Sequence, residues 1–330
     1  MRHVRILGLS LAAVFAMSAM AAVPALAAKD PYSPATWEQY KYCPINSPIM
    51  AKAIEERREV DCFDGRTSGG VNGGYFSLGN VTVKLSKPIS LQGAFYTKLE
   101  EGNGETEEEK TQGPSGGLKI VGAENGGQTL ESPELTVQGG LGLITKADEV
   151  AAGWPAALKA SFKEAKKNKE THLGVKIEVA GNTLYTTWGS LDTENLLFEK
   201  GNAFVLPLKV RMINTWLEKL GPGPCETGNE EHPVIQDLTT EPPGRTATLY
   251  HNARFTNIEL KGSRLVDLNW SVPTEGDATG CGGAYESYVD AALNEVMELP
   301  HQHGTTVLEG DLFTAQFTTV KNELEKGEEE

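Results

Sequence analysis

Few residues in the sequence have a type and spacing that could bind a metal, and His301 and His303 are the clearest candidates. A His-x-His pair can place two imidazoles on one side of a strand, where they could ligate a transition metal. A third ligand could come from His232, His251, Glu309 or Asp311. Pro300 and Gly304 flank the pair, however, and predict a loop with solvated histidines after a helix. We therefore assign no metal ligand and no cofactor.

The residues that could catalyse hydrolysis are also scattered along the sequence. The G-x-S-x-G elbow of serine hydrolases is absent, and Gly189-Ser190 is interpreted as a turn. Glycosidases need two carboxylates about 5 to 10 Å apart, and three aspartates lie in or beside predicted strands: Asp237, Asp267 and Asp277. Because 45 acidic residues make chance pairs unavoidable, no pair is singled out and the catalytic residues stay unassigned. Four tryptophans could stack on sugars, but their spacing favours core positions: Trp154, Trp188, Trp216 and Trp270.

The cysteines form an even set, Cys43, Cys62, Cys225 and Cys281. In an exported chain such a set favours two disulfides, and the absence of short C-x-x-C spacings argues against zinc. Three pairings are open from the sequence. We expect Cys43–Cys62 and Cys225–Cys281, because each pair brackets turn-rich sequence.

The N-terminal segment predicts export. Arg2 and Arg5 precede an apolar run that ends at Ala25-Leu26-Ala27, so residues 1–27 are predicted to be a signal peptide, with a retained membrane anchor as the alternative. No later segment is long and apolar enough to suggest a transmembrane helix. The formal net charge of −15 argues against nucleic acid or an anionic membrane as a partner. We expect a secreted, extracellular or cell-envelope location.

Two segments share a pattern, PISLQGAF (88–95) and PELTVQGGL (133–141). In each, alternate apolar residues fall on one face, and a glycine after the glutamine, Gly93 or Gly139, predicts a bulge or bend. The two copies share neither a nucleophile nor a titratable group. We interpret the repeat as a strand used twice as scaffold.

Apolar residues alternate along most of the remaining chain, which predicts many short strands. Helical periodicity is limited to three segments: 49–59, 153–170 and 285–299. We expect a mainly β fold, an antiparallel β-sandwich or related β-rich fold with about three short helices. Residues 28–320 are predicted to form a single β-rich unit, with two sub-layers as one arrangement of it, and a last strand pair is expected at 305–320.

Two acidic segments interrupt this pattern. Residues 100–117 predict a flexible acidic loop and residues 321–330 an acidic disordered tail, because runs of like charge bury little apolar surface. A calcium loop is the alternative for the first segment, but the spacing of an EF-hand loop is missing.

Several motifs together resemble a group of exported actinobacterial proteins that have no known activity. The matching features are Cys43-Pro44, LGNVTVKLSKPISLQGAF, LTVQGGLG, LPLKVRMINTWL before Cys225, PVIQDLTT, and Gly280-Cys281-Gly282-Gly283. The likeness spans roughly residues 43–315. It implies an exported protein with two disulfides and carries over no functional residue.

The leading hypothesis is therefore a non-catalytic exported β protein with a binding or structural role in the cell envelope or outside it. One alternative is a secreted hydrolase that acts on a glycan or ester. Another is a carrier of a small apolar ligand, or an oligomeric β assembly with a lumen. A large apolar cavity would favour the carrier, and a pocket holding two close carboxylates or a Ser-His pair would favour the hydrolase.

Overall fold

The structure is a computed structural model, and it divides the chain into two units, Met1–Glu38 and Gln39–Glu330. It describes residues 37–327 except 59, 71–72, 79–80, 97–117, 124–128, 139, 141–150, 182–186, 192–194, 197–200, 222, 242–246, 252–255 and 300–303. The predicted signal peptide and acidic loop lie outside these residues, as do His301 and His303. The described elements belong to the second unit, apart from η1 (Glu38–Tyr40) at the boundary.

Strands dominate the second unit, which confirms the expectation of a mainly β fold. The strands are β1 (Val60–Thr67), β2 (Gly74–Leu78), β3 (Val81–Lys84), β4 (Ser90–Tyr96), β5 (Leu118–Gly122), β6 (Leu130–Glu131), β7 (Leu135–Thr136), β8 (Gly174–Val179), β9 (Thr187–Leu191), β10 (Asn202–Ile213), β11 (Cys225–Thr227), β12 (Val234–Thr240), β13 (Ala247–His251), β14 (Thr256–Trp270) and β15 (Gly304–Gln316). The helices are α3 (Pro48–Glu55), α6 (Ala156–Lys167), α8 (Thr215–Leu220), α9 (Glu286–Met297) and α10 (Phe317–Gly327), with short 3₁₀ turns η4 (Ala151–Gly153), η5 (Thr274–Gly276) and η6 (Gly283–Tyr285).

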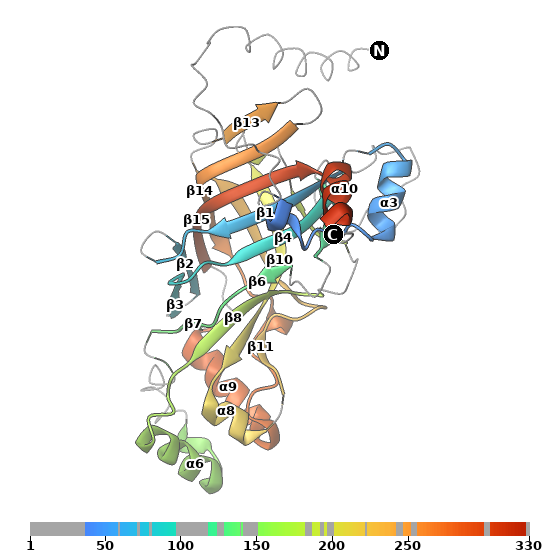
Figure 1. The fold of residues 1–330 in the computed structure, drawn as a ribbon. Helices are drawn as coiled ribbons and strands as arrows, with labels where there is room; N and C mark the ends of the chain where they lie inside the picture. The colour runs from blue at the N-terminus through green and yellow to red at the C-terminus, as the bar shows by residue number, and fades with distance from the viewer. Residues whose placement is uncertain are drawn as a thin grey trace, which may run out of the picture. The chain divides into compact units, whose positions relative to one another are not determined.

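All the described strands belong to one antiparallel sheet (Figure 1), and the pairings of β14 close its circuit. Leu265 and Val266 of β14 pair with β12 through one edge and with β15 through the other. The order β14-β12-β10-β9-β5-β4-β1-β15 therefore returns to β14, and the sheet is strongly curled. The sandwich that we expected would have two separate sheets. The difference arises because alternation along a strand reports one buried face but not which strands become neighbours.

Strand β10 joins the closed part of the sheet to its extension. Its first half pairs with β9 and β12, and its second half pairs with β8 and β11. Pro207 lies where the neighbour on one side changes from β9 to β8. Because proline has no N–H to give, it is tolerated at this break in the ladder. Pro207 thus marks a change of partner within a long strand.

Three helices gather near the extension formed by β8 and β11 (Figure 1). The ring of Trp216 in α8 stacks on that of Trp154 at a centroid distance of 6.1 Å and packs against Phe162 of α6 at 4.9 Å. The apolar stripe of α9 is buried, as its helical spacing predicted. The segments predicted to be helical at 153–170 and 285–299 thus contain α6 and α9, and 49–59 contains most of α3.

The disulfides join Cys43 to Cys62 and Cys225 to Cys281, the two pairs that we expected. The first links the turn before α3 to β1, and the second links β11 to the turn before α9. Each therefore fixes a helix beside the sheet.

The two copies of the repeated pattern have become strands of very different length. The first copy is β4, which is buried and central, whereas the second contributes only the short β7 and a bridge from Val137 to Val83. Gly93 has a φ of 155° and a Cβ there would lie 2.4 Å from the Val121 carbonyl oxygen, so this position requires glycine. Gly139 lies outside the described residues.

Three local expectations are wrong. The segment 321–330 was predicted to be disordered and 305–320 to be a strand pair, but β15 runs as one strand to Gln316 and α10 continues to Gly327. Buried Phe317 and Val320 anchor this helix, and the Lys321–Glu325 pair supports it. Gly189-Ser190 is not a turn but part of β9, where Gly189 has a φ of 57°.

Candidate functional site

Of the residues considered as metal ligands, Glu309 and Asp311 have other partners, and His301 and His303 lie outside the described residues. Glu309 lies 3.9 Å from the Arg264 guanidinium, and the Asp311 carboxylate accepts a hydrogen bond from the backbone N–H of Gly262 at 2.8 Å. Within the described ranges, no group of three or more histidine, cysteine, aspartate or glutamate side chains could hold a metal ion.

The strand aspartates have structural partners. Asp267 accepts hydrogen bonds from the backbone N–H of Asp237 at 2.7 Å and of Asn269 at 3.1 Å. Burial raises the pKa of Asp267, and burial together with the Asp267 charge raises that of Asp237. Asp277 accepts from the side chain of Asn294 at 3.0 Å. The three cavities described below are lined by none of these aspartates.

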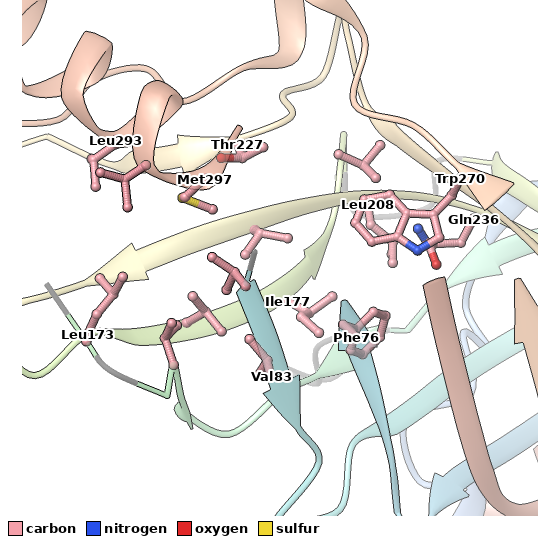
Figure 2. A pocket seen from close by; sticks show the side chains of 17 residues that line it. Phe76, Val83, Leu173, Ile177, Leu208, Thr227, Gln236, Trp270, Leu293 and Met297 are labelled. Atoms are coloured by element: carbon pink, nitrogen blue, oxygen red, sulfur yellow. The ribbon is translucent and has the colours of Figure 1, made fainter. Parts of the chain in front are cut away.

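An apolar cavity of about 70 Å³ lies between the sheet and α9, and we call it the first cavity (Figure 2). Leu293 and Met297 of α9 lie on one side of it, and Phe76 and Val83 of the β2–β3 hairpin lie on the opposite side. Side chains of β8 and β10 form its floor, including Ile177 and Leu208. None of the described residues that line it carries a charged side chain.

Two further apolar cavities continue from the first. The middle cavity, of about 30 Å³, shares four lining residues with the first cavity: Phe76, Ile177, Leu208 and Gln236. It shares six with the far cavity, of about 90 Å³, inside the closed part of the sheet: Thr67, Ile89, Leu130, Leu206, Leu238 and Leu308. Single layers of side chains therefore separate the three cavities.

The inner face of β10 runs past all three cavities. Phe204 and Leu206 line the far cavity, Leu206 and Leu208 the middle one, and Leu208 and Val210 the first. These residues alternate, so they share one face of the strand. Six residues of strand rise by about 20 Å, which is therefore the length of the cavity series along β10.

Polar groups occupy a few defined places in this apolar interior. The hydroxyl of Thr306 donates to the side-chain oxygen of Gln236 at 2.6 Å, and both residues are buried beside the middle cavity. Among the described lining residues, the charged ones are Arg66 and Asp311, and both belong to the far cavity. The Arg66 guanidinium lies 3.1 Å from Asp64, and its side chain is 52% exposed. Charge on the described lining residues is thus confined to this end.

A local irregularity of β14 aims Trp270 at the first cavity. The sequence places Val266, Leu268 and Trp270 on one strand face, but the register shifts between Asp267 and Trp270. Leu268 is therefore 59% exposed, whereas Trp270 is buried. The hydrogen bond from Asn269 to Asp267 stabilises this bulge.

Asp290 of α9 makes stability depend on pH beside the second disulfide. Its carboxylate accepts a hydrogen bond from the backbone N–H of Cys281 at 2.9 Å, and burial raises its pKa to about 6. Because an unfolded aspartate has a pKa of about 3.9, the folded state binds more protons between about pH 4 and pH 6. The free energy of unfolding contributed by this group therefore falls as pH rises through that range.

Asp290→Asn is expected to remove this decrease. Urea unfolding of both proteins at a series of pH values should show a smaller fall in the variant between about pH 4 and pH 6. Glu286→Gln, which only removes a nearby charge, serves as the milder control. Parallel pH profiles for wild type and Asp290→Asn would contradict the assignment.

No described helix is long and apolar enough to cross a membrane. A scan against protein-family models, a search of curated proteins and a search of solved structures find no match to this chain.

Proposed function

We propose that this chain is an exported, non-catalytic binding protein that holds a single unbranched apolar chain, of the acyl class, inside its curled sheet. The series of apolar cavities along β10 carries this proposal. The two disulfides are consistent with an extracellular protein. The signal peptide, the envelope location and membership of the exported actinobacterial group are part of the same proposal.

The dimensions of the cavities favour a thin chain over a bulky ligand. Each cavity is smaller than the roughly 150 Å³ that accommodates benzene, so no single one would hold a ring system. The three cavities together extend about 20 Å along β10 by strand rise. A lipid chain in one leaflet reaches about 15 Å, half of a hydrocarbon core, so the series is long enough to hold such a chain. A chain that displaces the intervening leucine side chains by rotamer changes would fill them together.

The lining also favours binding over hydrolysis. Of the described residues, only threonine, glutamine and tryptophan give the first and middle cavities polar side chains, and no described histidine lines any of the three. A serine or carboxylate mechanism needs a base or a second carboxylate beside the reacting bond. Apolar walls with few polar groups are typical of a ligand site.

The first test is direct. Purified protein from the exporting host should release a lipid on extraction with chloroform and methanol, identified by mass spectrometry. Lipid-free protein should then bind alkyl compounds more tightly as the chain lengthens, by about 0.8 kcal/mol for each CH₂ buried. Affinity that does not depend on chain length would contradict the proposal.

Leu208→Trp is expected to block the series, because Leu208 is buried and lines both the first and the middle cavity. Displacement of a neutral naphthylamine dye should show binding reduced at least tenfold. Leu268→Trp is the matched control, since Leu268 is exposed and lines none of these cavities. If Leu208→Trp does not fold, Ile177→Phe provides a second test, because it adds less volume at a residue that also lines both the first and the middle cavity.

A further inference from the structure

Two hydrogen-bond donors at the first cavity have no partner. The indole Nε1 of Trp270 and the hydroxyl of Thr227 are buried, with 6% and 1% of each residue exposed, and neither is hydrogen-bonded to any part of the chain that the structure describes. Both residues line the first cavity (Figure 2). A buried donor without an acceptor is destabilising, and an indole N–H can only donate. Two residues that line the cavity therefore carry donors that no described group of the chain satisfies.

The fold holds both donors in fixed positions. Gly304 pairs with Trp270, and a Cβ on Gly304 would lie 2.3 Å from the indole ring, so the ring packs directly on the glycine backbone. Thr227 is paired with Val210 of β10 and lies two residues after the disulfide-bonded Cys225. Donors held in this way need little reorganisation to bind an acceptor.

We propose that the first cavity receives the uncharged oxygen group of a neutral lipid, an ester carbonyl or a hydroxyl, whose chain extends towards the far cavity. This inference rests on the proposed function. The donors at Trp270 and Thr227 call for an acceptor, and the described residues that line this cavity include no charged side chain, which selects against a carboxylate. A carboxylate would lose its hydration there without a counter-charge.

A free fatty acid would be expected to bind in the opposite direction. Among the described residues that line the three cavities, Arg66 is the only cation, and it lies at the far one. Its guanidinium already pairs with Asp64, whose carboxylate also accepts a hydrogen bond from Gln92 at 2.7 Å. The two orientations therefore depend on different residues and can be separated by substitution.

The experiment measures displacement of the neutral naphthylamine dye by tetradecanol, methyl tetradecanoate and tetradecanoate, at a pH where the acid is ionised. The alcohol and the ester are expected to bind more tightly than the acid. Trp270→Phe and Thr227→Val keep similar shapes but remove one donor each. Either change should weaken ester or alcohol binding about three- to tenfold, while affinity for the dye changes little.

Trp216→Phe is the matched control. Its indole N–H already donates to the Ser161 hydroxyl at 3.0 Å, and it does not line the first cavity, so ester affinity should be unchanged. Unaltered ester binding in both donor variants would overturn the inference. The inference would also be overturned if the protein bound the acid most tightly and Arg66→Gln abolished that binding, although the proposed function would then stand. Failure of every alkyl compound to displace the dye would instead refute the proposed function itself.

Discussion

Replacing Cys225 and Cys281 together with alanine is expected to lower the free energy of unfolding by about 4 kcal/mol. The bond closes a loop with a sequence separation of 56 residues, so its loss restores much freedom to the unfolded chain. Both cysteines are also buried, and Cys281 is completely inaccessible. Denaturant unfolding of wild type and variant, each extrapolated to water, measures the difference.

The Cys43–Cys62 bond provides the comparison. Its sequence separation is 19 residues, for which the same reasoning gives a loss of about 3 kcal/mol. Equal stability of wild type and the Cys225/Cys281 double variant would show that this bond does not restrict the unfolded chain. Disulfide mapping that connects Cys43 to Cys225 or Cys281 would overturn the pairing itself.

Val137→Asp is expected to cost about 4 kcal/mol or to prevent folding. Val137 is 2% exposed and lines the first cavity, where the new carboxylate would have no cation beside it. The neighbouring Gln138 is exposed, so Gln138→Asp introduces the same charge one residue away and should change stability by less than about 0.5 kcal/mol.

Thermal and urea unfolding followed by circular dichroism compare the two variants. If Val137→Asp does not accumulate, Val137→Ala, which removes about two methylene equivalents, should still cost about 2 kcal/mol. A native-like and equally stable Val137→Asp protein would mean that the repeated segment PELTVQGGL is not scaffold.

Local patterns in the sequence predicted the local structure well. Helix α9 follows an i, i+3, i+4, i+7 stripe, and all of the residues that form it are buried: Val289, Ala292, Leu293 and Val296. Alternation also identified the inner face of β10. These predictions succeed because the spacing at which buried residues recur, 3.6 residues in a helix and 2 in a strand, indicates the conformation of each segment.

Cross-strand contacts could not be predicted in this way. Gln92 looks like a polar residue beside a glycine bend, yet it is buried and donates to Asp64, which is 1% exposed. This bond exists because the register of β1 and β4 pairs these two residues directly. Register between strands depends on the whole sheet, and a single sequence does not reveal it.

From the sequence, the cavity series was anticipated only in general terms, as the alternative of a carrier for a small apolar ligand. Its lining comes from strands distant in the sequence, and the bulge that turns Trp270 inward follows from side-chain hydrogen bonds of Asp267. The sequence offered one signal, an excess of leucine on the inner strand faces, but the same excess also describes a fully packed core.

Strand β15 determines the order in which this sheet can be completed. It is the last described strand in the chain, yet it pairs with β1, β2 and β14. Until it is present, those three strands each lack a neighbour, and their open edges can pair with other molecules. The chain must therefore be present through Gln316 before the sheet closes, which is expected to make folding slow and to require protection of the unfinished edges.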